Sequence, residues 1–267
     1  MYLGCEYVMA VASPFSFHEE IQPKRDLVDP TIAALIHLLE TAVATPSVKR
    51  VIITGSQATV FNYDYGPSRD YMYTEKDWNP VTYEQACNPP QDIYCGPLIY
   101  AYAGGKTLAE KAAWEFTRNN AQEKFDIVCI LPSWIFDPTT WQPTSSADFS
   151  ESNKIIYGLY QGQAPPSDIF PHWVDVRDVA RAHVLAIEKR NAGGYRLIVN
   201  SGPFRVRDAI VSLKKLESRV VDPEHVKNLD KWCGMDNGKS VELLGMKYIG
   251  LDQCFTDMVE QFKKMTA

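Results

Sequence analysis

The chain has 267 residues, of which 45% are hydrophobic and 22% charged, and its formal net charge is −6. Such a composition is typical of a globular protein with one or two domains and a sizeable core. The acidic balance and the lack of a long basic run exclude a groove for nucleic acid, and no apolar run is long enough for a membrane span.

The cysteines and histidines predict neither disulfides nor a metal site. Six cysteines lie scattered without C-x-x-C spacing, and five histidines show no metal-ligand spacing. This pattern favours free thiols in the reducing cytoplasm. Residues 1–12 are apolar, but Glu6 interrupts them and no basic segment precedes them, so we expect a buried strand there rather than a signal peptide.

Strands and helices are expected to alternate along the chain, which indicates a layered α/β fold. Asp29 is expected to cap one helix, with Pro30 in its first turn. A proline-bearing, aromatic insertion, residues 62–98, interrupts the alternation. The expected strands are 7–11, 51–54, 127–131 and 197–199, and the expected helices are 30–43, 102–118 and 178–188.

Tyr102 and Lys106 form a Tyr-x-x-x-Lys pair at the expected start of the helix 102–118. Residues four apart lie on the same face of a helix, so the two side chains can meet. A lysine cation near a phenol favours the phenolate and lowers the tyrosine pKa, which suits the tyrosine to proton transfer. The pair alone is also compatible with an ordinary helix start whose lysine lays its stem along the surface.

Ser56 follows the apolar strand 51–54 and precedes the Tyr-x-x-x-Lys pair in the chain. A hydroxyl at a strand end can hold a substrate oxygen beside a tyrosine, although a turn residue is the simpler interpretation. The order of serine, tyrosine and lysine resembles the short-chain dehydrogenase/reductase superfamily. The resemblance is to its extended branch, which contains dihydroflavonol-reductase-like enzymes and yeast-type ketone and aldehyde reductases. Further segments match that branch in its own order over essentially the whole chain, namely 11–15, 75–80, 131–138, 173–180 and 244–248.

The resemblance implies a Rossmann-like, doubly wound parallel sheet with a small C-terminal substrate lobe. Residues 1–138 would form the core, and 139–267 would form the lobe, interleaved with the last core helix, 178–188, and strand, 197–199. Family members begin with a Gly-rich turn that holds the dinucleotide pyrophosphate. This sequence is expected to start near the family's fourth strand, which makes the core a truncated one, and its two Gly-Gly pairs do not replace that turn.

The resemblance also implies roles for single residues. Ser56 would hydrogen-bond a substrate carbonyl, Tyr102 would donate a proton to it, and Lys106 would lower the tyrosine pKa and hold the nicotinamide ribose. If a nucleotide binds, it would contact Tyr102 and Lys106 and, in addition, Ala12, Ser13, Thr54, Pro132 and Ser133. The substrate is expected to contact Gln57, Trp134, Phe136, Tyr157, His172 and Trp173.

Three functions remain open from the sequence. The family's usual activity is NADPH-dependent reduction of a ketone or aldehyde, here on a small apolar or aromatic substrate. A cofactor-independent isomerase, dehydratase or cyclase of secondary metabolism would reuse the same pocket without a nucleotide. A non-catalytic binding protein is the third. The apolar strand 7–11 would lie at the edge of the truncated sheet, so we also expect a homo-oligomer, with helices 30–43 and 102–118 as a second route to pairing.

Overall fold

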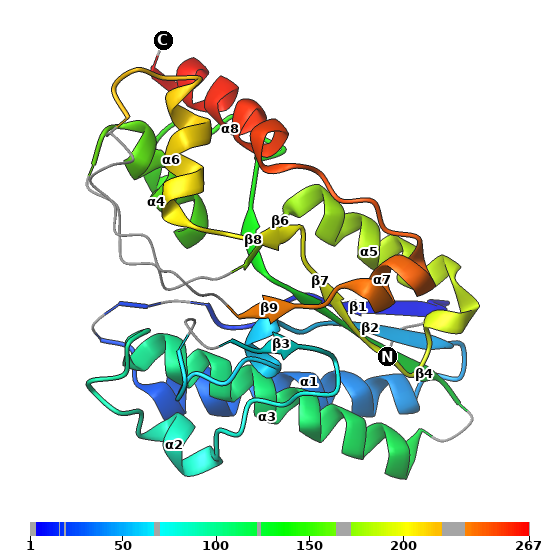
Figure 1. Ribbon diagram of the computed structural model, residues 1–267. Coiled ribbons are helices and arrows are strands. Elements are labelled where there is room, and N and C mark those ends of the chain that lie inside the picture. The colour runs from blue at the N-terminus through cyan, green and yellow to red at the C-terminus, as the bar shows by residue number, and fades with distance from the viewer. Residues whose placement is uncertain are drawn as a thin grey trace.

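The computed structural model describes residues 4–15, 17–18, 20–66, 70–121, 124–163, 172–220 and 233–266. A parallel sheet with the strand order β1-β2-β4-β7 lies at its centre (Figure 1). These strands span Tyr7–Ala10, Arg50–Thr54, Asp126–Pro132 and Arg196–Val199. Each differs by no more than one residue at either end from its expected range, because apolar runs bounded by polar residues mark buried parallel strands well.

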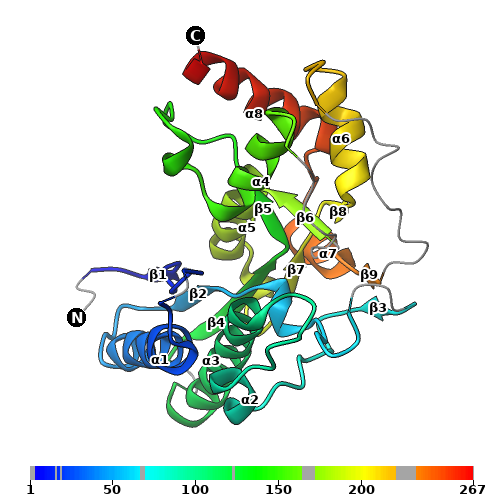
Figure 2. The ribbon, with the colours of Figure 1, turned by 90° about the vertical axis from the view of Figure 1, so that its left-hand side faces the viewer.

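Helices cover both faces of this sheet (Figures 1 and 2). One face carries α1 (Asp29–Val43) and α3 (Pro97–Asn120), and the other carries α5 (Val176–Glu188) and α7 (Gly238–Leu244). Parallel sheets are buried on both faces by their crossover helices, so β2 and β4 are apolar almost throughout. The expected α/β, Rossmann-like fold is confirmed.

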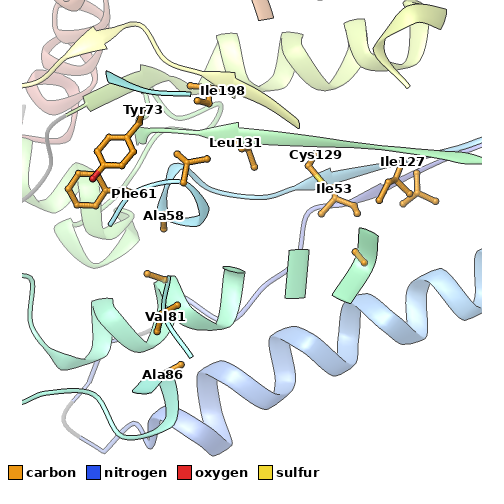
Figure 3. Packing of buried hydrophobic residues seen from close by; sticks show 14 of the residues in the cluster. Ile53, Ala58, Phe61, Tyr73, Val81, Ala86, Ile127, Cys129, Leu131 and Ile198 are labelled. Atoms are coloured by element: carbon orange, nitrogen blue, oxygen red, sulfur yellow. The ribbon is translucent and has the colours of Figure 1, made fainter. Parts of the chain in front are cut away.

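In the core between the sheet and the α1–α3 layer, β2 and β4 supply most of the residues that come from the sheet (Figure 3). Ile53, Ile127, Cys129 and Leu131 are all buried in it. Burying one large apolar side chain contributes about 1.5–3 kcal/mol, so this layer holds α3 firmly against the sheet. Figure 3 shows Phe61 and Tyr73 together at one end of the core, and their ring centroids are 5.2 Å apart.

The start of α1 differs from the sequence expectation. A single π-helical segment, Pro23–Val28, leads directly into α1, so Asp29 already lies inside the helix and does not cap it. Its carboxylate instead accepts a hydrogen bond from the Tyr83 hydroxyl at 2.7 Å and pairs with Lys24 at 3.3 Å. The cap prediction was wrong because the helical turn ahead of Asp29 carries no periodic apolar pattern of its own.

The helix α3 begins earlier than expected. Gly96 adopts a φ of +83°, which turns the chain, and Pro97 then opens the helix. Tyr102 therefore lies in the second turn rather than at the helix start. Gly104 permits a close contact with the short helix α2 (Tyr83–Cys87), since a Cβ at Gly104 would lie 2.4 Å from the Cβ of Ala86.

A second layer forms the lobe beyond the carboxyl edge of the central sheet (Figure 2). Its sheet has the order β5-β6-β8, with strands Trp134–Phe136, His172–Asp175 and Gly202–Pro203. The lobe helices are α4 (Glu151–Tyr160), α6 (Val206–Lys214) and α8 (Leu251–Thr266). Phe136 packs in the lobe core although it precedes the expected start of the lobe at residue 139, and the division at residue 138 stays a prediction.

The remaining elements are short. The insertion 62–98 holds β3 (Met72–Tyr73) and α2, and β3 pairs with β9 (Gly234–Met235). Single 3-10 turns lie at Gln57–Thr59, Ser146–Asp148 and Arg190–Ala192. None of the helices in the described ranges is long and apolar enough to cross a membrane.

The strand β1 lies at one edge of the central sheet as far as the chain is described, pairing with β2 alone. Tyr7 and Met9 are 40% and 39% exposed along it, and Val11, the next residue after it, is 62% exposed. An apolar edge of this kind is a template for pairing with another strand.

Candidate active site

A cavity of about 320 Å³ opens at the carboxyl edge of the central sheet. The segments that leave β1, β2 and β4 line it, together with α3 and the start of α4. Ligands of open α/β sheets bind at this edge because the loops that diverge there leave a crevice. Ser56, Tyr102 and Lys106 all line this cavity, so the structure brings the three predicted catalytic residues together.

Tyr102 lies under two phenylalanines from the segment that follows β1. The rings of Phe15 and Phe17 meet it edge-on, with centroids 5.0 Å and 6.1 Å from that of Tyr102. Burial raises the pKa of Tyr102 to about 12, although a hydrogen bond with Ser56 lowers this pKa and so offsets part of the rise. Tyr102 therefore keeps its proton near neutral pH and is available as an acid.

Ser56 is held in place by the turn that it starts. Its Oγ accepts a hydrogen bond from the backbone N of Ala58 at 3.1 Å, capping the 3-10 turn. The Oγ lone pairs are thus partly used, while the hydroxyl proton is directed to the phenol of Tyr102. A hydroxyl fixed in this way can donate to an oxygen placed between Ser56 and Tyr102.

Lys106 is buried, and its Nζ donates to the carbonyl of Thr54 at 2.7 Å. Burial lowers its pKa to about 8, while the nearby Glu110 carboxylate raises it. The sequence led us to expect that Lys106 would lower the pKa of Tyr102. The structure contradicts this, because the ammonium group is turned to Thr54 and the loss of solvent dominates at the phenol.

The residues expected to hold a cofactor border two adjoining cavities. Pro132 and Ser133 line the first, Ala12 lines a second cavity of about 190 Å³, and Ser13 and Thr54 line both. The Thr54 hydroxyl is hydrogen-bonded to Nε2 of His183 at 2.7 Å. The Ser13 Oγ is buried and has no hydrogen-bond partner among the described residues, which leaves it available to a ligand.

The residues expected to contact substrate fall into two groups. Gln57 and Trp134 line the first cavity, and the buried Oε1 of Gln57 has no partner within the described part of the chain. The other four do not line either cavity, and they lie instead in or against the lobe: Phe136, Tyr157, His172 and Trp173. Phe136 and Trp173 pack inward because β5 and β6 pair side by side and turn these two rings toward the helices of the lobe, whereas Tyr157 reaches the same core from α4.

These four residues are occupied with packing. Phe136 stacks on Trp173 with centroids 6.0 Å apart, and Tyr157 stacks on Tyr160 at 6.1 Å. His172 is buried, which lowers its pKa to about 4 and holds the ring neutral. Their contribution to substrate binding stays a prediction.

Several cavity residues were not assigned a role from the sequence: Phe15, Phe17, Tyr63, Ile99, Ile135, Asp137, Ser150 and Ser152. The two-residue spacing of Phe15 and Phe17, in the segment that follows the expected strand 7–11, was a usable sign that the two rings share one side. No local pattern marks Ser150 and Ser152, because the lobe brings α4 to the cavity from a distant part of the chain.

Comparison with known proteins gives consistent relatives, although no family model matches the chain. The chain is 32% identical over 260 residues to an oxidoreductase of Schizosaccharomyces pombe, C513.07, covering 96% of this chain and 75% of the relative. It is 31% identical over 271 residues to the NADPH-dependent methylglyoxal reductase GRE2 of Saccharomyces cerevisiae, covering 96% and 76%. It is 33% identical over 264 residues to the ketoreductase azaE of Aspergillus niger, covering 95% and 74%.

Solved structures give the same result. The yeast methylglyoxal/isovaleraldehyde reductase Gre2, complexed with NADPH, superposes with a TM-score of 0.85 at 29% identity, over 98% of this chain and 77% of that one. Gre2 from Candida albicans superposes with a TM-score of 0.81 at 27% identity, over 98% and 78%. This chain therefore spans about three quarters of the length of these proteins.

Proposed function

The chain belongs to the extended short-chain dehydrogenase/reductase superfamily, together with the yeast-type ketone and aldehyde reductases, and we propose that it is an NADPH-dependent carbonyl reductase. Its substrate is a small aldehyde or ketone with an apolar or aromatic body. The observation that carries the proposal is the meeting of Ser56, Tyr102 and Lys106 in one cavity at the carboxyl edge of the sheet. The named activities of the reductases GRE2 and azaE support it.

The residues present fit the nicotinamide and ribose end of NADPH. The unpartnered Ser13 hydroxyl and the Lys106 ammonium lie where the two cavities adjoin, and Pro132 and Ser133 form the wall of the first. A ribose diol needs such donors and acceptors, and a flat ring needs such a wall. Lys106 is the single cation among the described residues that line these cavities, so these residues fit the nicotinamide and ribose end of NADPH.

When bound, NADPH supplies the hydride that adds to the substrate carbonyl carbon. Ser56 donates a hydrogen bond to the carbonyl oxygen and fixes its position. Tyr102 transfers its phenolic proton to the same oxygen, so that the C=O group becomes CH–OH. An alkoxide is a stronger base than a phenolate, even one whose conjugate acid has a pKa of about 12, so this transfer runs downhill.

Lys106 restores the tyrosine. Its pKa of about 8 lies below that of Tyr102, so the ammonium group, held by the Thr54 carbonyl in the same cavity, is a proton source from which return of a proton to the phenolate is favourable. Phe15 and Phe17 cover the phenol, and the loss of solvent there keeps it protonated until the carbonyl is in place.

The test is a steady-state assay of the purified chain with NADPH and either methylglyoxal or isovaleraldehyde. We expect carbonyl-dependent oxidation of NADPH and formation of one alcohol per nucleotide consumed. A folded chain that oxidises no NADPH with these aldehydes or with an aryl ketone would overturn the proposal.

We further propose that the protein forms a homo-oligomer in the cytoplasm. The exposed apolar edge of β1 supports self-association, and the six free cysteines support a reducing compartment. Light scattering at micromolar concentration tests the first point, and a clean monomer would contradict it. Fractionation of the source cells tests the second, and recovery outside the cytoplasm would contradict it.

A further inference from the structure

We propose that Asp137 makes this site select carbonyl substrates that carry a hydrogen-bond donor, a hydroxyl or an ammonium group, at the end remote from the carbonyl. The inference rests on the proposed function. It assigns to the cavity a second polar end, formed by the lobe, in addition to the one formed by Ser56, Tyr102 and Lys106.

Asp137 reaches the cavity from the end of β5. It follows Phe136, the last residue of that strand, and it lines the same cavity as Tyr102. Asn153, which is fully buried, holds its backbone on both sides. The Asp137 backbone N donates to Asn153 Oδ1 at 3.1 Å, and Asn153 Nδ2 donates to the Asp137 carbonyl at 2.6 Å. The backbone from which the carboxylate extends is therefore fixed.

The Asp137 carboxylate itself has no protein donor among the residues that the structure describes. The hydrogen bonds of Asp137 all involve its backbone. Its charged neighbour is Asp175, whose two oxygens are taken up by Arg177 at 2.9 Å and 2.7 Å. Burial and the Asp175 charge both raise the pKa of Asp137. A half-buried carboxyl group without a donor gains from a ligand that brings one.

The start of α4 adds hydroxyl groups to the wall of the same cavity. Ser150 and Ser152 line the cavity, and their Oγ atoms are 3.2 Å apart. Ser152 donates to the carbonyl of Ile135 at 2.5 Å, which leaves its oxygen as an acceptor. Ser152 is next in sequence to Asn153, the residue that holds Asp137, so the three polar groups belong to one region of the wall.

The rest of the wall is mainly apolar, and it includes Phe15, Phe17, Tyr63, Ile99 and Trp134. A volume of about 320 Å³ lies at the lower end of the range for small-molecule sites. A substrate that spans it places its carbonyl at Ser56 and Tyr102, its apolar body between the aromatic rings, and its donor at Asp137. Hydroxyl and ammonium groups share the donor chemistry, and the experiment separates them.

The experiment compares pairs of aryl ketones that differ only at the position remote from the carbonyl, hydroxyl against methoxy and aminomethyl against methyl. We expect the wild type to prefer the donor-bearing member of at least one pair by about 10-fold or more in kcat/KM, as for a hydrogen bond to a charged group. Asp137→Ala should reduce that preference to about 1. Asp137→Asn should keep a hydroxyl preference and lose an ammonium preference, because its amide is uncharged.

Glu151→Gln is the matched control. Glu151 also lies at the start of α4, but its carboxylate is exposed and pairs with Lys154, so we expect the substrate preferences of the wild type. An unchanged preference in Asp137→Ala, or equal rates for both members of both pairs in the wild type, would overturn the inference.

Two measurements keep this result separate from the proposed function. Isovaleraldehyde carries no donor, so its reduction by the wild type reports reductase activity alone. The affinities of the same ketone pairs, measured by calorimetry, report the donor preference without turnover. A chain that reduces nothing but binds the donor-bearing ketones more tightly, with the difference lost in Asp137→Ala, would support the inference while the reductase proposal failed.

Discussion

The buried ion pair between Glu110 and Arg196 is predicted to hold the catalytic helix to the sheet. Arg196 donates to both carboxylate oxygens of Glu110, at 2.7 Å and 3.2 Å, and its guanidinium lies 3.5 Å from the ring centre of Trp78. It also donates to the carbonyls of Glu75 and Asp77 at 2.8 Å and 2.7 Å. One guanidinium thus joins β7, α3 and the segment 75–78.

Glu110→Gln removes the charge and keeps nearly the same shape. Two unit charges about 4 Å apart attract by about 4 kcal/mol at an effective dielectric constant of about 20. Removing one member of a buried pair typically costs about 3–5 kcal/mol, because the other charge stays buried without compensation. The amide introduced by the substitution still accepts one hydrogen bond from Arg196, so we expect a loss of about 3 kcal/mol in the free energy of unfolding, at the lower end of that range.

Urea unfolding followed by circular dichroism measures this loss, with Glu151→Gln as the control. Glu151 and Lys154 form an exposed pair three residues apart on α4, so that variant should lose less than about 0.5 kcal/mol. A loss below about 1 kcal/mol for Glu110→Gln would refute the reasoning, since the pair would then contribute no more than a surface contact.

The same substitution should change the pH profile of the enzyme. The Glu110 carboxylate raises the pKa of Lys106, which burial has lowered to about 8. Without that charge the pKa of Lys106 falls further, so the ammonium form is lost at a lower pH. We expect the alkaline limb of kcat to move to lower pH in Glu110→Gln, and an unmoved limb would show that Lys106 does not titrate in this range.

Three further predictions concern the site and its supports. Ser56→Ala should lower kcat/KM by about 10- to 100-fold, because the hydrogen bond to the substrate carbonyl is lost. It should also lower the free energy of unfolding by about 1 kcal/mol, because Ser56 caps its turn. Full activity in a steady-state assay would remove Ser56 from the mechanism. The pKa of His172 is about 4 in the folded chain and about 6.5 in the unfolded chain. Its contribution of about 3 kcal/mol to the free energy of unfolding is therefore fully present above about pH 6.5 and is lost as the pH falls toward 4. Urea titrations at several pH values should show a shallower acid dependence in His172→Gln than in the wild type, and identical slopes would contradict the assignment. Gly104→Ala places a Cβ 2.4 Å from that of Ala86. The substitution should lower the free energy of unfolding by about 1–3 kcal/mol in the same urea assay. No loss would mean that α2 moves freely away from α3.

The sequence contained enough information to predict the central sheet and the meeting of Ser56, Tyr102 and Lys106. Buried parallel strands are continuous apolar runs, and the Tyr-x-x-x-Lys spacing fixes two side chains on one helix face. The expected pKa of Tyr102 was wrong for a physical reason. Helical spacing places Lys106 near the tyrosine, but it does not reveal that the Thr54 carbonyl takes the ammonium or that two rings from another segment desolvate the phenol.

The outer half of the cavity was less predictable. Phe136 and Trp173 come from segments that resemble active-site motifs, yet their strands turn them into the lobe core. Asp137, one residue further along, faces the cavity instead. Alternation along a strand decides between these two directions, and its phase depends on how the lobe packs against the sheet.

The measurement that tests the central claim most directly is the NADPH-dependent reductase activity of Tyr102→Phe beside the wild type. The account predicts that the variant folds and keeps its affinity for NADPH, because only the phenolic oxygen is removed. Its kcat should fall by at least about 100-fold, since the proton donor is lost. A variant that folds, binds NADPH and reduces carbonyls at the wild-type rate would contradict the account.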